Sequence, residues 1–311
     1  MSEQKLEIFN ILNFLNSGYK LDDIINEGQF GTFSSAEECI EYLVGEGYLE
    51  GDIEVTDDVE ITAEHISKKY AVSELKDILR ENGLNVSGNK HELVERVVAV
   101  LKQARDARNV NIDVSTNKSY DDLHLTGKAY DFLTENEWID LYMFALVAFR
   151  FSDYETYYEN SKVGSVETAL AFCDEILSRA LMANQFLVFI DALSAKAHVY
   201  AYDGDYDSFL DYDLQRYIIG LNPIVMDSQT YATYNIINKA NIINIKNVTE
   251  KLEMGSLKKR FDRIWNKSHI TDITVPKKIC YKMLQRALDG ADIEELNFDL
   301  KERYFNKKFG I

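Results

Sequence analysis

The sequence predicts a mainly α-helical protein of several domains, and three observations lead to that class. The chain has 311 residues, which exceeds the usual size of one compact domain. It contains 15 glycines and only 2 prolines, so few residues interrupt helices. Hydrophobic residues make up 46% of the chain, which is enough to build a folded core.

Charge is distributed in blocks along the chain. The formal net charge is −18, from 34 basic and 52 acidic residues. Residues 1–69 sum to −12, 70–108 to +1, 109–245 to −12 and 246–311 to +5. The total disfavours a protein that coats nucleic acid or an anionic membrane with its whole surface. Any contact with DNA must therefore be local.

Residues 1–67 are predicted to form a small acidic helical domain. Apolar residues recur at helical spacing over 6–15, 21–25 and 39–43. Apolar residues then lie among acidic ones, as in one or two short strands, at Ile53, Val55, Val59 and Ile61. Helices followed by strands is the element order of a winged-helix domain. The acidic charge favours a protein-contacting or structural role over DNA binding.

Residues 68–104 are predicted to form a separate module of two helices joined by a bend. Leu75 and Leu79 fall on one face of the first helix, and Gly83 is suited to its end, where a positive φ is needed. Asn89, with Glu92 three residues later, is a candidate N-cap for the second helix. A bend at a helix start presents free N–H groups to an anion such as a phosphate.

This module resembles the SAP domain over about residues 68–102. The matching residues are Val72, Leu75-Lys76, Leu79, Gly83-Leu84, Ser87-Gly88-Asn89-Lys90, Leu93 and Glu95-Arg96. The resemblance implies weak binding to the backbone and minor groove of double-stranded DNA, often A·T-rich. The predicted DNA-binding residues are Lys76, Arg80, Ser87, Gly88, Asn89, Lys90 and Arg96. The alternative is a simple turn at Ser87-Gly88, with Lys90 and Arg96 paired to Glu92 or Glu81.

The rest of the chain divides into a polar segment and a long helical part. Residues 105–125 are predicted to be a linker or a wing-like strand, and residues 126–311 a helical interaction domain with a basic segment at 246–311. Residues 195–223 resemble a single tetratricopeptide repeat. The run at 257–267, LKKRFDRIWNK, is either a second nucleic-acid contact or a helix that docks on the acidic array.

Motifs for catalysis, nucleotides or metals are missing from the sequence. It has no GxxxxGK[ST], GxGxxG, HExxH or Gly-x-Ser-x-Gly pattern, and its three cysteines are isolated from one another. We therefore expect no catalytic residues, no metal and no cofactor. No secretory signal or membrane span is recognised, so an intracellular protein, cytoplasmic or DNA-associated, is expected.

The sequence thus predicts a non-enzymatic protein in which the SAP-like module contacts duplex DNA and the acidic helical domain contacts an unknown protein. The alternative is an acidic interaction or inhibitor protein that binds a basic DNA-binding protein. Its tyrosines and aspartates would then mimic bases and phosphates, and the SAP-like module would serve protein contact.

Overall fold

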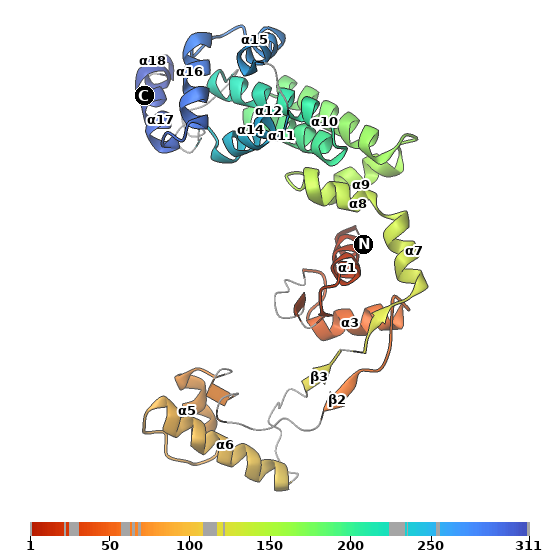
Figure 1. The fold of residues 1–311 in the computed structure, drawn as a ribbon. Coiled ribbons are helices and arrows are strands. Elements are labelled where there is room, and N and C mark those ends of the chain that lie inside the picture. Colours follow the sequence, from red (N-terminus) through yellow and green to blue (C-terminus); the bar gives the residue numbers. More distant parts are fainter. Residues whose placement is uncertain are drawn as a thin grey trace. The chain divides into compact units, whose positions relative to one another are not determined.

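In the computed structural model the chain is mainly helical, which confirms the predicted fold class (Figure 1). The structure describes residues 2–21, 23–24, 31–56, 63, 66–67, 70–107, 117–120, 122–223, 234, 236–252 and 256–309. The chain divides into two compact units: residues 12–130 form one, and residues 1–11 with 131–311 form the other. None of the described helices is both long enough and apolar enough to cross a bilayer.

The first unit holds the N-terminal helices and the two-helix module. Helix α1 (Ser2–Asn16) ends within this unit, and α3 (Ala36–Gly45) begins at the N-cap Ser35, whose side chain accepts a hydrogen bond from the N–H of Glu38. The buried apolar residues of these helices include Leu12, Cys39, Ile40 and Leu43. Residues 22 and 25 of the predicted run 21–25 lie outside the described residues.

Two short antiparallel strand pairs join segments that lie before and after the two-helix module in sequence. The pairs are β1 (Leu49–Glu50) with β4 (His124–Leu125), and β2 (Glu54–Thr56) with β3 (Asn117–Ser119). The register places Leu49 opposite Leu125. The chain therefore leaves on β2, forms the module and returns on β3. In topology, the module is an insertion between paired strands.

The predicted division at residues 67, 104 and 125 stays a prediction, and the strand pairing adds a link between the segments before and after the module. Residues 117–119 and 124–125 belong to strands, the second of the two interpretations of 105–125. The reason is that pairing ties the segment after the module to the segment before it, a long-range relationship that local composition does not encode. Val55 lies in β2, whereas Val59, Ile61 and residues 108–116 and 121 lie outside the described residues.

Gly51 and Thr126 fix the ends of the strand pairs. Gly51 has φ +133°, and a Cβ there would lie 2.9 Å from the carbonyl carbon of Asp122, so the close approach of the two strands needs glycine. The Thr126 hydroxyl donates to the carbonyl oxygen of Gly47 at 2.7 Å, and the Thr126 N–H donates to the Tyr48 carbonyl at 3.1 Å.

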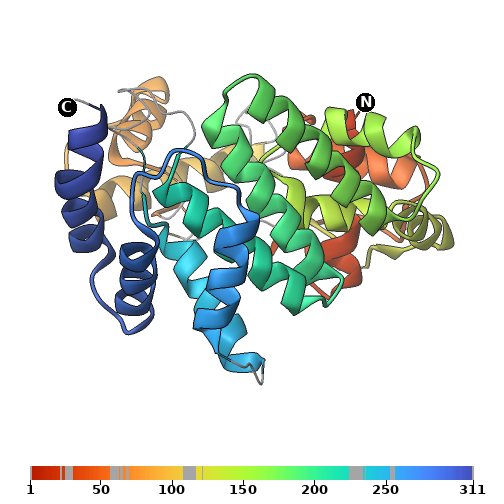
Figure 2. The same cartoon turned by 90° about the horizontal axis from the view of Figure 1, so that it is seen from above.

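The second unit is an array of helices. Neighbouring long helices pack side by side and antiparallel, joined by short turns such as the one at Gly204, φ +80° (Figures 1 and 2). Its elements are α7 (Gly127–Glu135, which begins in the first unit), α8 (Trp138–Leu141), the π-helix η1 (Tyr142–Leu146), α9 (Phe151–Glu159), α10 (Ser165–Met182), α11 (Phe186–Tyr202), α12 (Tyr206–Leu221), α14 (Lys239–Lys251), α15 (Leu257–Lys267), α16 (Lys277–Leu288), α17 (Ile293–Leu300), η2 (Lys301–Phe305) and α18 (Asn306–Phe309).

Buried polar side chains connect the later helices of this array. The Tyr217 hydroxyl on α12 donates to the carbonyl oxygen of Cys280 on α16 at 2.9 Å. Asn222 accepts from the N–H groups of Thr274 and Val275 at 2.9 and 3.0 Å, which holds the segment before α16 against the end of α12. Buried backbone groups need such partners, so these side chains replace regular pairing where the chain is irregular.

Candidate nucleic-acid interface

The module consists of two helices around a small apolar core. Helix α5 (Val72–Glu81) and helix α6 (Lys90–Ala107) pack against each other. The buried residues of this core are Ile66, Leu75, Leu79, Leu93, Val94, Val97 and Leu101. They recur at three- and four-residue spacing, so each helix buries one apolar face and leaves its charged face in water.

The end of α5 has the hydrogen bonds of a Schellman motif. Gly83 adopts φ +69°, and the N–H of Leu84 donates to the carbonyl oxygen of Leu79 at 2.8 Å. This arrangement satisfies carbonyl groups that the last helical turn leaves without partners. It also turns the chain sharply toward the bend at residues 85–88, as the Gly83 position predicts.

The bend is held by a side chain that local spacing does not reveal. The guanidinium of Arg96 donates to the carbonyl oxygens of Asn85 and Ser87, and its Nε donates to the Glu92 carbonyl at 3.1 Å. The Asn85 side chain accepts from the N–H of Ser87 at 2.8 Å and from its hydroxyl at 2.7 Å. An Asn two residues before a Ser is the sequence signal for this Asx turn.

Gly88 is required by the same arrangement. Its φ is +128°, and a Cβ there would lie 2.7 Å from Nη2 of Arg96 and still closer to the Glu92 carboxylate. Asn89 then caps α6: its Oδ1 accepts from the N–H of Glu92 at 3.1 Å, and its own N–H donates to the Glu92 carboxylate at 3.1 Å. The predicted capping box is therefore present.

The structure divides the predicted contact residues into two groups. Ser87, Gly88, Asn89 and Arg96 build the bend and the helix start, and the polar side chains of Ser87, Asn89 and Arg96 already bond within the module. The second group carries exposed or half-exposed basic side chains: Lys76 and Arg80 on α5, and Lys90 at the start of α6. Arg80 pairs with Asp77.

Two lysines are available for an anion. Among the described residues neither Lys76 nor Lys90 forms an ion pair; Lys90 is exposed and Lys76 is half-exposed. Lys90 is the first residue of α6. The first intrahelical hydrogen bond runs from the Leu93 N–H to the Asn89 carbonyl, so the N–H groups before Leu93 have no partner within the helix backbone. A helix start with a nearby ammonium is suited to a phosphate oxygen.

Comparison with protein families agrees with this geometry. Residues 67–102 match the SAP domain family. The match covers α5, the bend and α6 as far as Lys102, and no part of the helical array. No curated protein and no solved structure matches the chain. The tetratricopeptide resemblance of residues 195–223, which span parts of α11 and all of α12, stays a prediction.

The basic helix α15 was the other predicted site of nucleic-acid contact. Arg260 donates through Nε to Asp211 at 2.6 Å and through Nη1 to Asp207 at 2.7 Å, both on α12. Arg263 pairs with the same Asp211 at 2.8 Å. Of the two interpretations, docking on the acidic array is the one that these contacts support for the arginines.

The tyrosines that lie among aspartates in the array are divided between core and surface. Tyr154 and Tyr217 are buried, whereas Tyr202 and Tyr206 are exposed. Within the described residues, no group of histidine, cysteine and carboxylate side chains has the arrangement of a metal site.

Cys173 and Cys280 are buried and form no disulfide, and burial raises the pKa of each thiol to about 12.

Proposed function

We propose that this chain is a non-enzymatic DNA-tethering protein. Its SAP domain contacts the backbone of duplex DNA, and its acidic helical array contacts a protein partner. The observation that carries the proposal is the bend held by Arg96, which leads into the start of α6, where Lys90 is exposed. The match of residues 67–102 to the SAP family supports DNA as the ligand.

The contact chemistry follows from which side chains remain available. Lys76, Arg80 and Lys90 supply the positive charge that would face the phosphates. Neutralising about three phosphates gives weak binding. The logarithm of the association constant then falls against the logarithm of the salt concentration with a slope near −3. Such contacts carry little sequence information, so binding is largely sequence-tolerant.

The experiment compares two double charge reversals in the full chain. Binding of a fluorescein-labelled 20-base-pair duplex is measured by anisotropy at low salt. Lys76→Glu with Lys90→Glu is expected to abolish binding, because both free ammonium groups are replaced by carboxylates. Lys259→Glu with Lys267→Glu changes the total charge equally on exposed positions of α15 and is expected to leave binding unchanged. The reverse pattern would contradict the proposal.

A second candidate function is favoured by the charge balance of the SAP domain. Residues 70–102 carry five basic and five acidic side chains, so the domain has no net positive field. In this case the chain is an acidic interaction protein that binds a basic DNA-binding protein, and the SAP fold serves protein contact. This candidate predicts no salt-dependent DNA binding by the wild-type chain, together with competition between the chain and DNA for the partner.

A further inference from the structure

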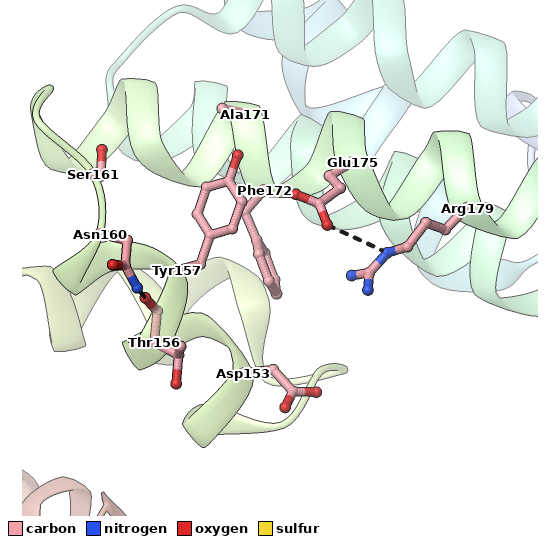
Figure 3. A pocket seen from close by; sticks show the side chains of 9 residues that line it. All are labelled: Asp153, Thr156, Tyr157, Asn160, Ser161, Ala171, Phe172, Glu175 and Arg179. Carbon is pink, nitrogen blue, oxygen red and sulfur yellow. Dashed lines mark hydrogen bonds and ion pairs between the residues drawn. The ribbon is translucent and has the colours of Figure 1, made fainter.

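A surface hollow lies between α9 and α10 in the helical array (Figure 3). Its volume is about 650 Å³, within the range of sites that bind small molecules or side chains. The residues that line it are Asp153, Thr156, Tyr157, Asn160, Ser161, Ala171, Phe172, Glu175 and Arg179. All of them belong to the acidic block at residues 109–245.

One wall of the hollow is aromatic and held in position. The half-buried ring of Tyr157 lies against the ring of Phe172, with centroids 5.3 Å apart (Figure 3). Phe172 is only 2% exposed and also packs edge-on against Tyr154 at 5.2 Å. A ring fixed in this way loses little conformational entropy when a ligand stacks on it.

Two carboxylates, of Asp153 and Glu175, also line the hollow. Asp153 lies four residues before Tyr157 on α9, so the two side chains share one face of the helix. Among the described residues, the Asp153 carboxylate has neither an ion pair nor a hydrogen bond. Glu175 on α10 also lines the hollow and pairs with Arg179 at 3.6 Å. Both partners of that pair are exposed, so it is weak and exchangeable.

We propose that this hollow binds an arginine side chain of a basic partner protein. A guanidinium is planar, stacks on an aromatic ring and bonds a carboxylate through two N–H groups, which fits Tyr157 with Asp153. The chain's own Arg179 pairs with Glu175 at the other side of the hollow, so a guanidinium already lies beside a carboxylate there. Charge complementarity favours a basic partner, because residues 109–245 carry 20 acidic and 8 basic side chains. The inference rests on the proposed protein-contacting role of the array.

The test uses a fluorescein-labelled octapeptide of alternating arginine and serine and the full chain at 50 mM salt. Saturable binding is expected for the wild type. Asp153→Asn is expected to weaken it about tenfold, since it removes the charge that faces the stacked guanidinium. Glu159→Gln removes one charge from the same helix outside the hollow. The affinity for the peptide is expected to change by less than about twofold. Equal losses for the two variants, or no saturable binding, would overturn the inference.

Two further measurements distinguish binding in the hollow from general attraction to the acidic surface. Tyr157→Leu keeps apolar packing but removes the stacking face, so weaker peptide binding is expected with unchanged circular dichroism. A lysine–serine octapeptide is expected to bind more weakly than the arginine peptide, and equal binding contradicts the arginine assignment. DNA binding of Asp153→Asn should equal that of the wild type. Failure of DNA binding in the wild type, with peptide binding retained, would contradict the proposed tethering and not this inference.

Discussion

Arg96 on α6 donates a hydrogen bond through Nη2 to the carbonyl oxygen of Ser87, nine residues earlier in the bend. The same guanidinium reaches the carbonyl of Asn85. One side chain therefore fixes the shape of the segment that leads into α6. Arg96 thus holds the bend of the candidate interface, and its predicted contact with DNA stays a prediction.

Arg96→Ala is expected to loosen the bend, because three hydrogen bonds from its charged group are lost. We expect hydrogen–deuterium exchange of the amides around residues 84–90 to accelerate about tenfold in the full chain. Lys90→Ala removes a neighbouring charge that forms no ion pair with the described residues, and it should leave this exchange unchanged. Equal acceleration in both variants would show that Arg96 does not hold the bend.

Gly88→Ala is expected to destabilise the SAP domain. Its φ of +128° is unfavourable for alanine, and the new methyl group would collide with Arg96 and Glu92. The loss should be about 1–3 kcal/mol, measured as faster exchange of the amides of α5 and α6. Gly45→Ala, at a helical position with open space around it, provides the control and should be neutral. A neutral Gly88→Ala would contradict the described geometry.

Local signals predicted the SAP domain well because they lie within a few residues of each other. Gly83 at the end of α5 and Asn89 with Glu92 at the start of α6 each encode one helix end, and both are confirmed. The role of Arg96 was not predicted, because its partners lie in a bend whose shape no periodicity describes. The pairing of residues 49–56 with 117–125 spans the whole module, and neither segment alone specifies its partner.

Arg260→Ala is expected to weaken the packing of α15 on α12. The Arg260 side chain is 14% exposed and bonds both Asp207 and Asp211, and its loss leaves Asp211 with Arg263 as its remaining ion-pair partner among the described residues. We expect a loss of about 2 kcal/mol in the free energy of unfolding, measured with urea. Arg286→Ala breaks an exposed pair with Asp299 at 3.9 Å and should cost less than about 0.5 kcal/mol. Similar losses for the two variants would argue against docking by charge.

Asp213 on α12 is a source of pH-dependent stability. It is 0% exposed, neither carboxylate oxygen has a hydrogen-bond partner, and Nη1 of Arg216 is 4.0 Å away. Burial raises its pKa from 3.8 to about 6, against the lowering effects of Arg216, His198 and the nearby side-chain amides of Asn241 and Asn244. Because the folded state binds the proton more tightly, this group lowers stability as pH rises from about 4 to about 6, and the loss persists above that.

Asp213→Asn is therefore expected to raise stability at pH 7.5 relative to the wild type. The gain is on the order of 2–3 kcal/mol at pH 7.5 and should fall below about 1 kcal/mol near pH 4, where the folded-state carboxyl is protonated and the unfolded-state carboxyl is about half ionised. Urea unfolding at the two pH values measures it, with Asp203→Asn as a control on an exposed residue. Destabilisation of equal size at both pH values would mean that the buried carboxylate is ionised and stabilising.

The salt dependence of DNA binding tests the tethering account most directly. The association constant of the full chain for a 20-base-pair duplex is measured from 25 to 200 mM salt, and log K is plotted against log salt. The account predicts a slope of about −3 for the wild type, and a slope smaller by about 1 for Lys90→Ala, because one phosphate contact is lost. A wild-type chain that shows no binding at 25 mM salt, or a slope that Lys90→Ala leaves unchanged, would contradict it.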